Sequence, residues 1–333
     1  MTDLKTINLS VHGLEIKCNI NDDNFLNFIK NNYSLFVTEN ISHADIVLNY
    51  SVPIKNITGK YISPSVIINK NSILYDPLLS HRHTKLTANM NYHDDQLDVT
   101  AQYYEPMMVK ILSLINRKTF QLQMYQRIIR FLLHYPLFWL LERDGFSIIH
   151  AATVAKNDEA LIFTGANGSG KTTLALSLLN DGYKLMADNF TLYKDDKVYA
   201  FPEVVRIANE TATLIGRKVS GNKVFGKYHL NLNEHELTNV AIIKKIFFVE
   251  SSPNFELNKI NDVSLAEKIE QMHEETKEFH YHSPIKYLNN IVSNPITNDT
   301  RGQRLRRLLS STEKVLLAYN RPAKLSAINK QLI

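Results

Sequence analysis

The most informative segment of the chain reads Gly165-Ala166-Asn167-Gly168-Ser169-Gly170-Lys171-Thr172, the pattern G-x-x-x-x-G-K-T. The apolar run 160–164 before it predicts a buried strand, and the run 172–179 after it predicts the start of a helix. A strand, this loop and a helix in that order form the context in which the pattern binds phosphate. The chain has only 11 glycines, and three lie here, which indicates positions that need a positive φ or a close backbone approach.

The chemistry of such a loop follows from its backbone. Successive N–H groups at a helix N-terminus form a nest that binds anions. Lys171 could reach the β- and γ-phosphates of a nucleotide, and the Thr172 hydroxyl could ligate Mg²⁺. We therefore expect ATP and Mg²⁺ as cofactors. The expected nucleotide-binding residues are Gly165, Ala166, Asn167, Gly168, Ser169, Gly170, Lys171, Thr172 and Thr173.

A loop of this kind also needs an acidic partner for Mg²⁺, normally at the end of a neighbouring apolar strand. Asp188 ends the run 183–187 and lies 17 residues after Lys171, so a short helix would return the next strand beside the loop. Glu250, at the end of 246–249, is the second candidate. Either carboxylate could instead cap a helix or a turn.

Histidines offer one further candidate. His150 follows the apolar run 146–149, and a strand there next to the strand 160–164 would bring its imidazole beside the phosphates. A lone histidine is more often structural, so this position alone does not decide its role. The other histidines, including His280 and His282, have no partner at metal-ligand spacing.

Composition sets the broad class. The 333 residues, 44% hydrophobic and 21% charged, are typical of a globular protein of about two domains. The formal net charge of +5 gives no reason to expect that the protein binds nucleic acid. A single cysteine, Cys18, excludes an internal disulfide and fits a reducing cytoplasm. The first 25 residues lack a continuous apolar core, which predicts no signal peptide. The apolar run 128–141, broken by Arg130, His134 and Pro136, is too short to cross a bilayer, so we expect no membrane partner.

Periodicity suggests three parts: a β-rich α+β N-terminal domain at 1–102, a helical connection at 103–145 and a nucleotide-binding domain at 146–333. A helix over 22–32 and antiparallel hairpins are expected in the first part. Its strands are predicted at 6–12, 14–18, 44–50, 65–69, 72–75, 85–90 and 97–102. Helices are expected in the second at 106–115 and 120–143, the latter kinked or split at Pro136.

The third part is predicted to be α/β. Its strands are expected at 146–149, 152–155, 160–164, 184–187, 189–193, 198–200 and 242–249. The tail is expected to hold helices at 265–277 and 285–292, a basic stretch 301–307, a strand 314–319 and a helix after Pro322.

Three stretches together resemble a known family: His-Ala-Ala-Thr-Val at 150–154, the loop with its strand at 161–172, and Asp-Gly-Tyr-Lys-Leu-Met-Ala-Asp-Asn at 181–189. They are similar to the C-terminal catalytic domain of HPr kinase/phosphorylase, and more so to HPr-kinase-like proteins with an upstream domain. The resemblance covers about 146–207. It implies a P-loop core related to phosphoenolpyruvate carboxykinase, a hydroxyl as phosphoryl acceptor, a catalytic pairing of His150 with Asp188, and a homo-oligomer.

The chain departs from that family in two places. Asn189 stands where the family has a second aspartate; an amide can ligate Mg²⁺ or bond a phosphate oxygen but cannot act as a base. No counterpart of the family's signature loop is recognisable, which argues against HPr as the substrate and against the phosphorylase half-reaction.

The leading hypothesis is an ATP-dependent kinase that phosphorylates a hydroxyl of a peptide, a protein or a small metabolite. Lys171 would offset phosphoryl charge, Thr172, Asp188 and Asn189 would hold Mg²⁺, and Asp188 or His150 would orient or deprotonate the acceptor. Candidates for a phosphate-stabilising arginine are Arg206, Arg301, Arg304, Arg306 and Arg321. The stretch 301–307 is equally typical of a solvated helix face.

Two alternatives belong to other classes. An ATPase or nucleotide switch would use the same loop. Transporter-type ATPases also carry a Leu-Ser-Gly-Gly-type signature, and the most similar segment here, Val219-Ser220-Gly221-Asn222, does not match it. A non-catalytic protein gated by nucleotide is the other alternative, and Asn189 in place of aspartate keeps it open.

Overall fold

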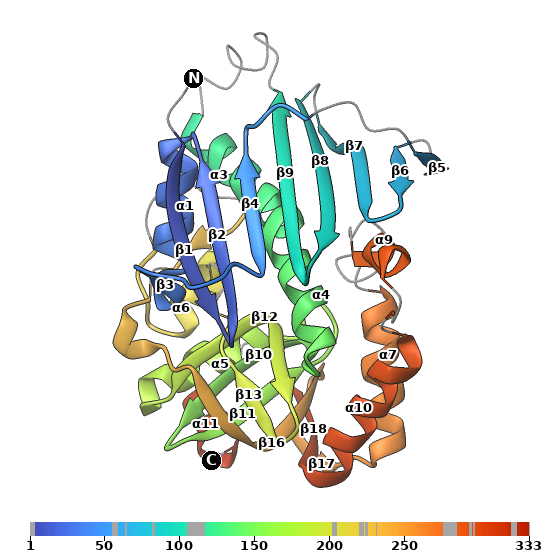
Figure 1. Ribbon diagram of the computed structural model, residues 1–333. Coiled ribbons are helices and arrows are strands. Elements are labelled where there is room, and N and C mark those ends of the chain that lie inside the picture. The colour runs from blue at the N-terminus through green and yellow to red at the C-terminus, as the bar shows by residue number, and fades with distance from the viewer. Residues whose placement is uncertain are drawn as a thin grey trace. The chain divides into compact units, whose positions relative to one another are not determined.

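The computed structural model describes residues 4–54, 59–63, 65–81, 84–104, 117–201, 205–219, 223, 226–230, 232–275, 285–292, 295, 297–320 and 325–332. The fold is mixed α/β, and the chain forms two compact units. One comprises Met1–Leu141 with Ser283–Pro295, and the other comprises Glu142–His282 with Ile296–Ile333. Most of their elements are labelled in Figure 1.

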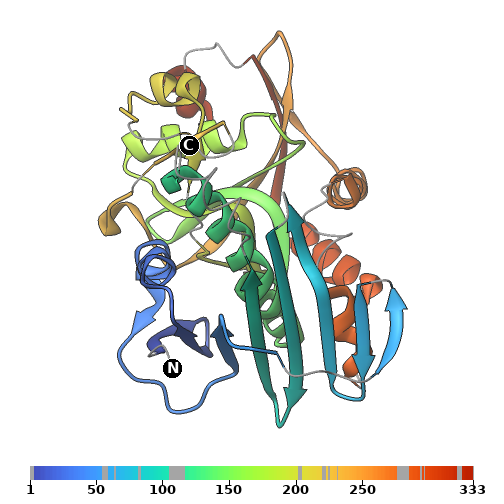
Figure 2. The same ribbon diagram turned by 90° about the horizontal axis from the view of Figure 1, so that it is seen from above.

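The first unit is built on one large sheet. Its described strands are β1 (Lys5–Val11), β2 (Leu14–Ile20), β3 (Val37–Thr38), β4 (Ile46–Tyr50), β5 (Lys60–Ser63), β6 (Val66–Asn69), β7 (Ser72–His81), β8 (Thr84–His93) and β9 (Gln96–Tyr104). The sheet order is β3-β1-β2-β4-β9-β8-β7-β6-β5, and Figures 1 and 2 show these strands, blue to teal, side by side. The expected antiparallel hairpins are confirmed for β1–β2 and for β6 through β9, whereas β4 pairs in parallel with both β2 and β9.

The helix expected over 22–32 is confirmed. Helix α1 (Asp23–Asn32) begins after Asp22, whose carboxylate accepts hydrogen bonds from the N–H groups of Asn24 and Phe25. The other described helices are α3 (Arg117–Ile129), α4 (Tyr135–Arg143, which continues into the second unit) and α9 (Ile285–Leu288). The helix expected at 106–115 lies outside the described residues.

Pro136 does not break the helical run in the way the sequence suggested. A π-helical turn, Arg130–His134, lies between α3 and α4, and the N–H of Tyr135 donates to the carbonyl of Arg130. Proline has no N–H to donate, and its ring crowds the carbonyl four residues earlier. A wider turn just before the proline lets the helix continue, so the run is reshaped at that turn and goes on through Pro136.

The second unit contains a sheet that partly closes on itself. Its strands are β10 (Ser147–Lys156), β11 (Glu159–Thr164), β12 (Lys184–Lys194), β13 (Lys197–Tyr199), β16 (Val240–Ser251), β17 (Glu256–Lys259) and β18 (Glu313–Tyr319), besides the small pair β14 (Arg206–Ile207) and β15 (Tyr228–His229). The order is β11-β10-β12-β13-β16-β18-β17, and β16 also pairs with β11, so five of these strands form a ring. Strands β11, β16 and β18 are parallel to one another.

The helices of the second unit are α5 (Lys171–Leu178), α6 (Asn209–Leu214), α7 (Asp262–Glu275), α10 (Asn298–Ser311) and α11 (Leu325–Leu332). A buried core packs α5 and α11 on β10, β11 and β18, with the rings of Phe163 and Phe247 stacked at 5.1 Å. Within the described part of the chain, no helix is both long and apolar enough to cross a membrane.

Two strand predictions in this unit were wrong in the same way. The segments 146–149 and 152–155 belong to one strand, β10, and 184–187 and 189–193 belong to one strand, β12. A polar residue was taken as a strand end in each case. His150 and Asp188 are instead 4% exposed each and lie inside continuous strands. The Asp188 carboxylate accepts from the Thr172 hydroxyl, and the backbone N–H and carbonyl of His150 bond the side chains of His273 and Thr164.

Candidate functional site

The loop 165–170 joins β11 to α5, and its first and last glycines are required by their surroundings. Gly165 has φ 143°, and a Cβ there would lie 2.3 Å from the carbonyl oxygen of Val249. Gly170 has φ 105°, and a Cβ there would lie 2.0 Å from the hydroxyl oxygen of Tyr319. A residue with a Cβ would have to displace the β16 backbone at position 165 and the Tyr319 side chain at position 170.

Two side chains in the loop region are buried and polar. Lys171 is 7% exposed, and its Nζ donates to the carbonyls of Gly165 at 2.7 Å and Ala166 at 3.0 Å, across the mouth of the loop. Ser169 is 6% exposed, and its hydroxyl has no hydrogen-bond partner among the described residues. A buried unsatisfied hydroxyl costs about 1–3 kcal/mol, so a water or a ligand oxygen that bonds Ser169 would stabilise the loop.

The first turn of α5 is tied to β12. The Thr172 hydroxyl donates to Oδ1 of Asp188 at 2.7 Å. A hydroxyl and a carboxylate oxygen are hard ligands that fit Mg²⁺, which is usually held by one or two protein oxygens together with phosphates. Groups of three or more His, Cys, Asp or Glu side chains placed to hold a metal are absent from the described residues. A Mg²⁺ ion at Thr172 and Asp188 would complete its shell with phosphate oxygens and water.

Asn189 has an unusual backbone. Its φ is 83°, in the left-handed region, although it lies inside β12 opposite Ala151 of β10. Asparagine and aspartate adopt that region more readily than other residues with a Cβ. Either residue therefore suits the backbone at this position, and asparagine also keeps an oxygen able to bind a cation next to Asp188.

Two side chains form hydrogen bonds to the backbone of His150. Its N–H donates to Nε2 of His273 at 3.2 Å, and its carbonyl accepts from the Thr164 hydroxyl at 3.0 Å. The register sets His150 opposite Phe190 and Ala152 opposite Asp188. Because positions 150 and 152 share a face of β10, His150 and Asp188 are diagonal neighbours across the two strands.

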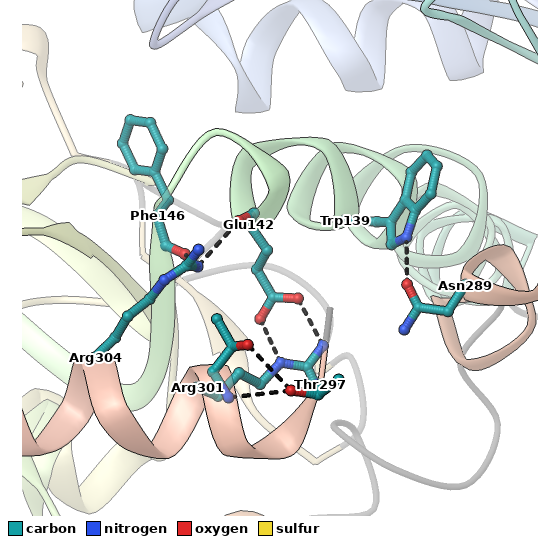
Figure 3. A network of polar contacts seen from close by, with 8 residues as sticks. Trp139, Glu142, Phe146, Asn289, Thr297, Arg301 and Arg304 are labelled. Atoms are coloured by element: carbon teal, nitrogen blue, oxygen red, sulfur yellow. Dashed lines mark hydrogen bonds and ion pairs between the residues drawn. The ribbon is translucent and has the colours of Figure 1, made fainter. Parts of the chain in front are cut away.

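Two of the arginines suggested as phosphate ligands are engaged elsewhere. Arg301 donates through Nε and Nη2 to Glu142 Oε1 at 2.8 Å and Oε2 at 2.6 Å, and Arg304 Nη1 donates to the carbonyls of Glu142 at 3.0 Å and Phe146 at 2.7 Å (Figure 3). Burial lowers the pKa of Arg301, but the Glu142 carboxylate outweighs it and the pKa is raised. These bonds fasten α10 to the junction between α4 and β10.

The other three candidate arginines lie in different parts of the chain. Arg306 is exposed on α10, Arg206 pairs with His229 in the β14–β15 ladder, and Arg321 lies outside the described residues, as do His280 and His282.

Glu250, the second acidic candidate, belongs to a different arrangement. It lies next to last in β16 and forms an ion pair with Lys268 of α7 at 2.7 Å, so Asp188 is the carboxylate bonded to Thr172. Sequence reasoning missed Tyr319, Lys268 and His273 as neighbours of the site. They come from segments more than 90 residues beyond the loop, and no local pattern could reveal them.

No protein-family model matches the chain, and no curated protein matches it either. Among solved structures, the chain is similar to the Hpr(Ser) kinase/phosphatase from Coxiella burnetii, with 13% sequence identity and a TM-score of 0.21. The alignment covers 34% of this chain and 78% of that one. A similarity this weak decides neither the detailed fold nor the function, which therefore has to be argued from the geometry of the site.

Proposed function

We propose that the protein is an ATP- and Mg²⁺-dependent kinase that transfers the γ-phosphoryl group to a hydroxyl, on a P-loop core of the kind found in HPr kinase and phosphoenolpyruvate carboxykinase. The observation that carries the proposal is the 2.7 Å bond from the Thr172 hydroxyl to Asp188, at the first turn of the helix that follows the glycine loop. Beside it, the buried Lys171 ammonium spans the loop mouth.

Each group has a defined role in this proposal. The N–H groups from Ala166 to Thr173 hold the phosphates. Lys171 exchanges its two carbonyl partners for oxygens of the transferred group. Thr172 and Asp188, with Asn189, hold Mg²⁺, which offsets negative charge on the β- and γ-phosphates when bound.

The acceptor hydroxyl must lose a proton. Asp188 and His150 are the two ionisable side chains that the β10–β12 register sets as neighbours next to the loop. The proton goes to one of them. Replacement of the true base flattens the corresponding limb of the pH–rate profile, which assigns the role.

The test is incubation of the purified chain with γ-labelled ATP, Mg²⁺ and extract from its own host, alongside Lys171→Ala and Asp188→Ala. Lys244→Ala is a matched control, because Lys244 forms an exposed ion pair with Glu159 away from the loop. Label on a discrete acceptor, lost in the first two variants and kept in the control, would support a kinase. Free phosphate without a labelled acceptor would refute it in favour of an ATPase. Tight ATP binding without turnover would refute it in favour of a nucleotide-gated binding protein.

A further inference from the structure

A cleft of about 350 Å³ opens beside the glycine loop in the second unit. One wall is the loop segment 166–169, a second is the end of β16 at 248–251, and the third is one side of α7. Helix α7 contributes Lys268, Gln271 and Met272, spaced so that they share a helix face. A volume near the low end of the range for ligand pockets suits a small molecule better than a folded partner.

The cleft begins where the transferred phosphoryl group would lie. Ala166 lines it, and the carbonyl of Ala166 is 3.0 Å from the Lys171 ammonium. Val249 lines it as well, and Gly165 packs directly on the Val249 carbonyl. A molecule in the cleft is therefore next to the group that Lys171 would hold, which is the place an acceptor hydroxyl must occupy.

The cleft presents two opposite charges over an apolar base. Glu250 and Lys268 form a 2.7 Å ion pair, and their side chains are 40% and 41% exposed. The Lys268 ammonium lies 5.1 Å from the ring centroid of Phe248, and Met272 is buried. An ion pair this exposed contributes little by itself, so each partner can turn toward an opposite charge on a ligand.

A second, independent observation points to a ligand. Ser169 lines the same cleft, is 6% exposed, and its hydroxyl has no partner within the described part of the chain. A ligand oxygen in the cleft would satisfy it. The cleft therefore combines an ammonium, a carboxylate and an unsatisfied hydroxyl beside the phosphoryl position.

We propose that this cleft is the acceptor subsite and that the acceptor is a small hydroxy amino acid, with its ammonium facing Glu250 and its carboxylate facing Lys268. The proposal rests on the proposed kinase function. The acceptor hydroxyl oxygen forms the new bond to the γ-phosphorus of ATP while the bond from that phosphorus to the β–γ bridging oxygen breaks. ADP leaves, and the hydroxyl proton goes to the base at Asp188 or His150 and then to water.

The experiment supplies the purified full chain with γ-labelled ATP, Mg²⁺ and, separately, L-serine, L-threonine, L-homoserine, N-acetyl-L-serinamide and glycerol. A labelled amino acid product is expected with at least one of the first three and not with the two uncharged compounds. Glu250→Gln and Lys268→Gln are expected to raise KM for that amino acid at least tenfold. The double variant Glu250→Lys/Lys268→Glu keeps an ion pair but reverses its direction, so it is expected to lose the acceptor as well.

Lys244→Gln, in an exposed pair of the same type, is the control that keeps the wild-type KM. Equal use of the capped serine or glycerol would overturn the zwitterionic acceptor. Label found only on a protein from host extract, or ATP binding without any labelled small acceptor, would overturn the small-molecule subsite while leaving the nucleotide site intact. Failure of the chain to bind ATP would instead refute the proposed kinase function, and the proposed acceptor subsite would be refuted with it.

Discussion

Replacing Gly170 with alanine tests whether the end of the glycine loop is shaped by β18. Gly170 has φ 105°, and its missing Cβ would lie 2.0 Å from Oη and 2.9 Å from Cζ of Tyr319. Tyr319 is fully buried and its hydroxyl donates to the Gly170 carbonyl at 3.3 Å, so a shift of the ring would break this bond and disturb a packed core. The substitution therefore adds a steric clash to backbone strain.

The size of the effect can be estimated from these two terms. A left-handed backbone costs a residue with a Cβ about 1–3 kcal/mol, and overpacking a buried ring costs about 1–3 kcal/mol more. Gly216→Ala is the matched control, because Gly216 has φ 69° but nothing within 4 Å of its Cβ position. We expect Gly170→Ala to be less stable than this control by roughly 2 kcal/mol, or about 4–8 °C in the Tm of a unit of this size.

A double-mutant cycle isolates the clash. Tyr319→Phe removes the oxygen that a Cβ at position 170 would approach most closely, so the double variant should recover roughly 1 kcal/mol relative to additivity. Calorimetry on the wild-type protein, the two single variants and the double variant, with amide hydrogen exchange in α5, measures the coupling free energy between positions 170 and 319. Equal Tm values for Gly170→Ala and Gly216→Ala, or strict additivity with Tyr319→Phe, would show that the tyrosine does not define the loop.

Three further results are expected. Thr172→Val removes the hydrogen bond to the buried Asp188, so it should lower stability by about 1–3 kcal/mol and weaken Mg²⁺-dependent ATP binding. Thr172→Ser should keep both the stability and the binding. If calorimetry and a binding titration give Thr172→Val the wild-type stability and ATP affinity, the proposed site is contradicted. Burial raises the pKa of Cys18 to about 12, so its thiol should react with a disulfide reagent at pH 8 only as the protein unfolds, and rapid native labelling would contradict that burial. Burial raises the pKa of Glu236, but hydrogen bonds from the Asn233 N–H and Arg217 outweigh it and hold the pKa below its ordinary value. Its contribution to stability is therefore complete above the carboxyl pKa of the unfolded chain and is lost as pH falls through the lower pKa of the folded chain. Glu236→Gln should remove this part of the acid-induced loss in a pH series of Tm values.

The strands that the sequence predicted well are those with one buried face. In β1 and β2, buried and more exposed positions alternate, and this is the pattern that periodicity detects. The parallel insertion of β4 between β2 and β9 could not be predicted, because pairing between distant segments leaves no local trace. Within the second unit, β10 and β12 were divided because they bury polar residues.

Those buried polar residues explain why the candidate site could be predicted only in part. The sequence pattern alone pointed to the glycine loop, because its glycines lie at the spacing of a known motif. It pointed to Asp188 because this carboxylate directly follows an apolar run. What holds them could not be inferred. Tyr319 is 149 residues from Gly170, and the side chain that bonds the His150 backbone comes from α7. Only the folded chain brings such partners together.

The location of the site follows from strand direction. Strands β11, β16 and β18 are mutually parallel, so their carboxyl ends meet at one edge of the sheet. At this edge β11 leads into the glycine loop. There β16 places Val249 against Gly165, and β18 places Tyr319 against Gly170. Ligands of α/β sheets bind at carboxyl ends of strands, where loops diverge and backbone groups are left to bind. The same edge carries Glu250, one residue after Val249, which is why the glycine loop and the end of β16 both line the proposed acceptor cleft. A substitution that shifts the end of β16 should therefore disturb both proposed subsites together, whereas one in β12 should act through the proposed roles of Asp188.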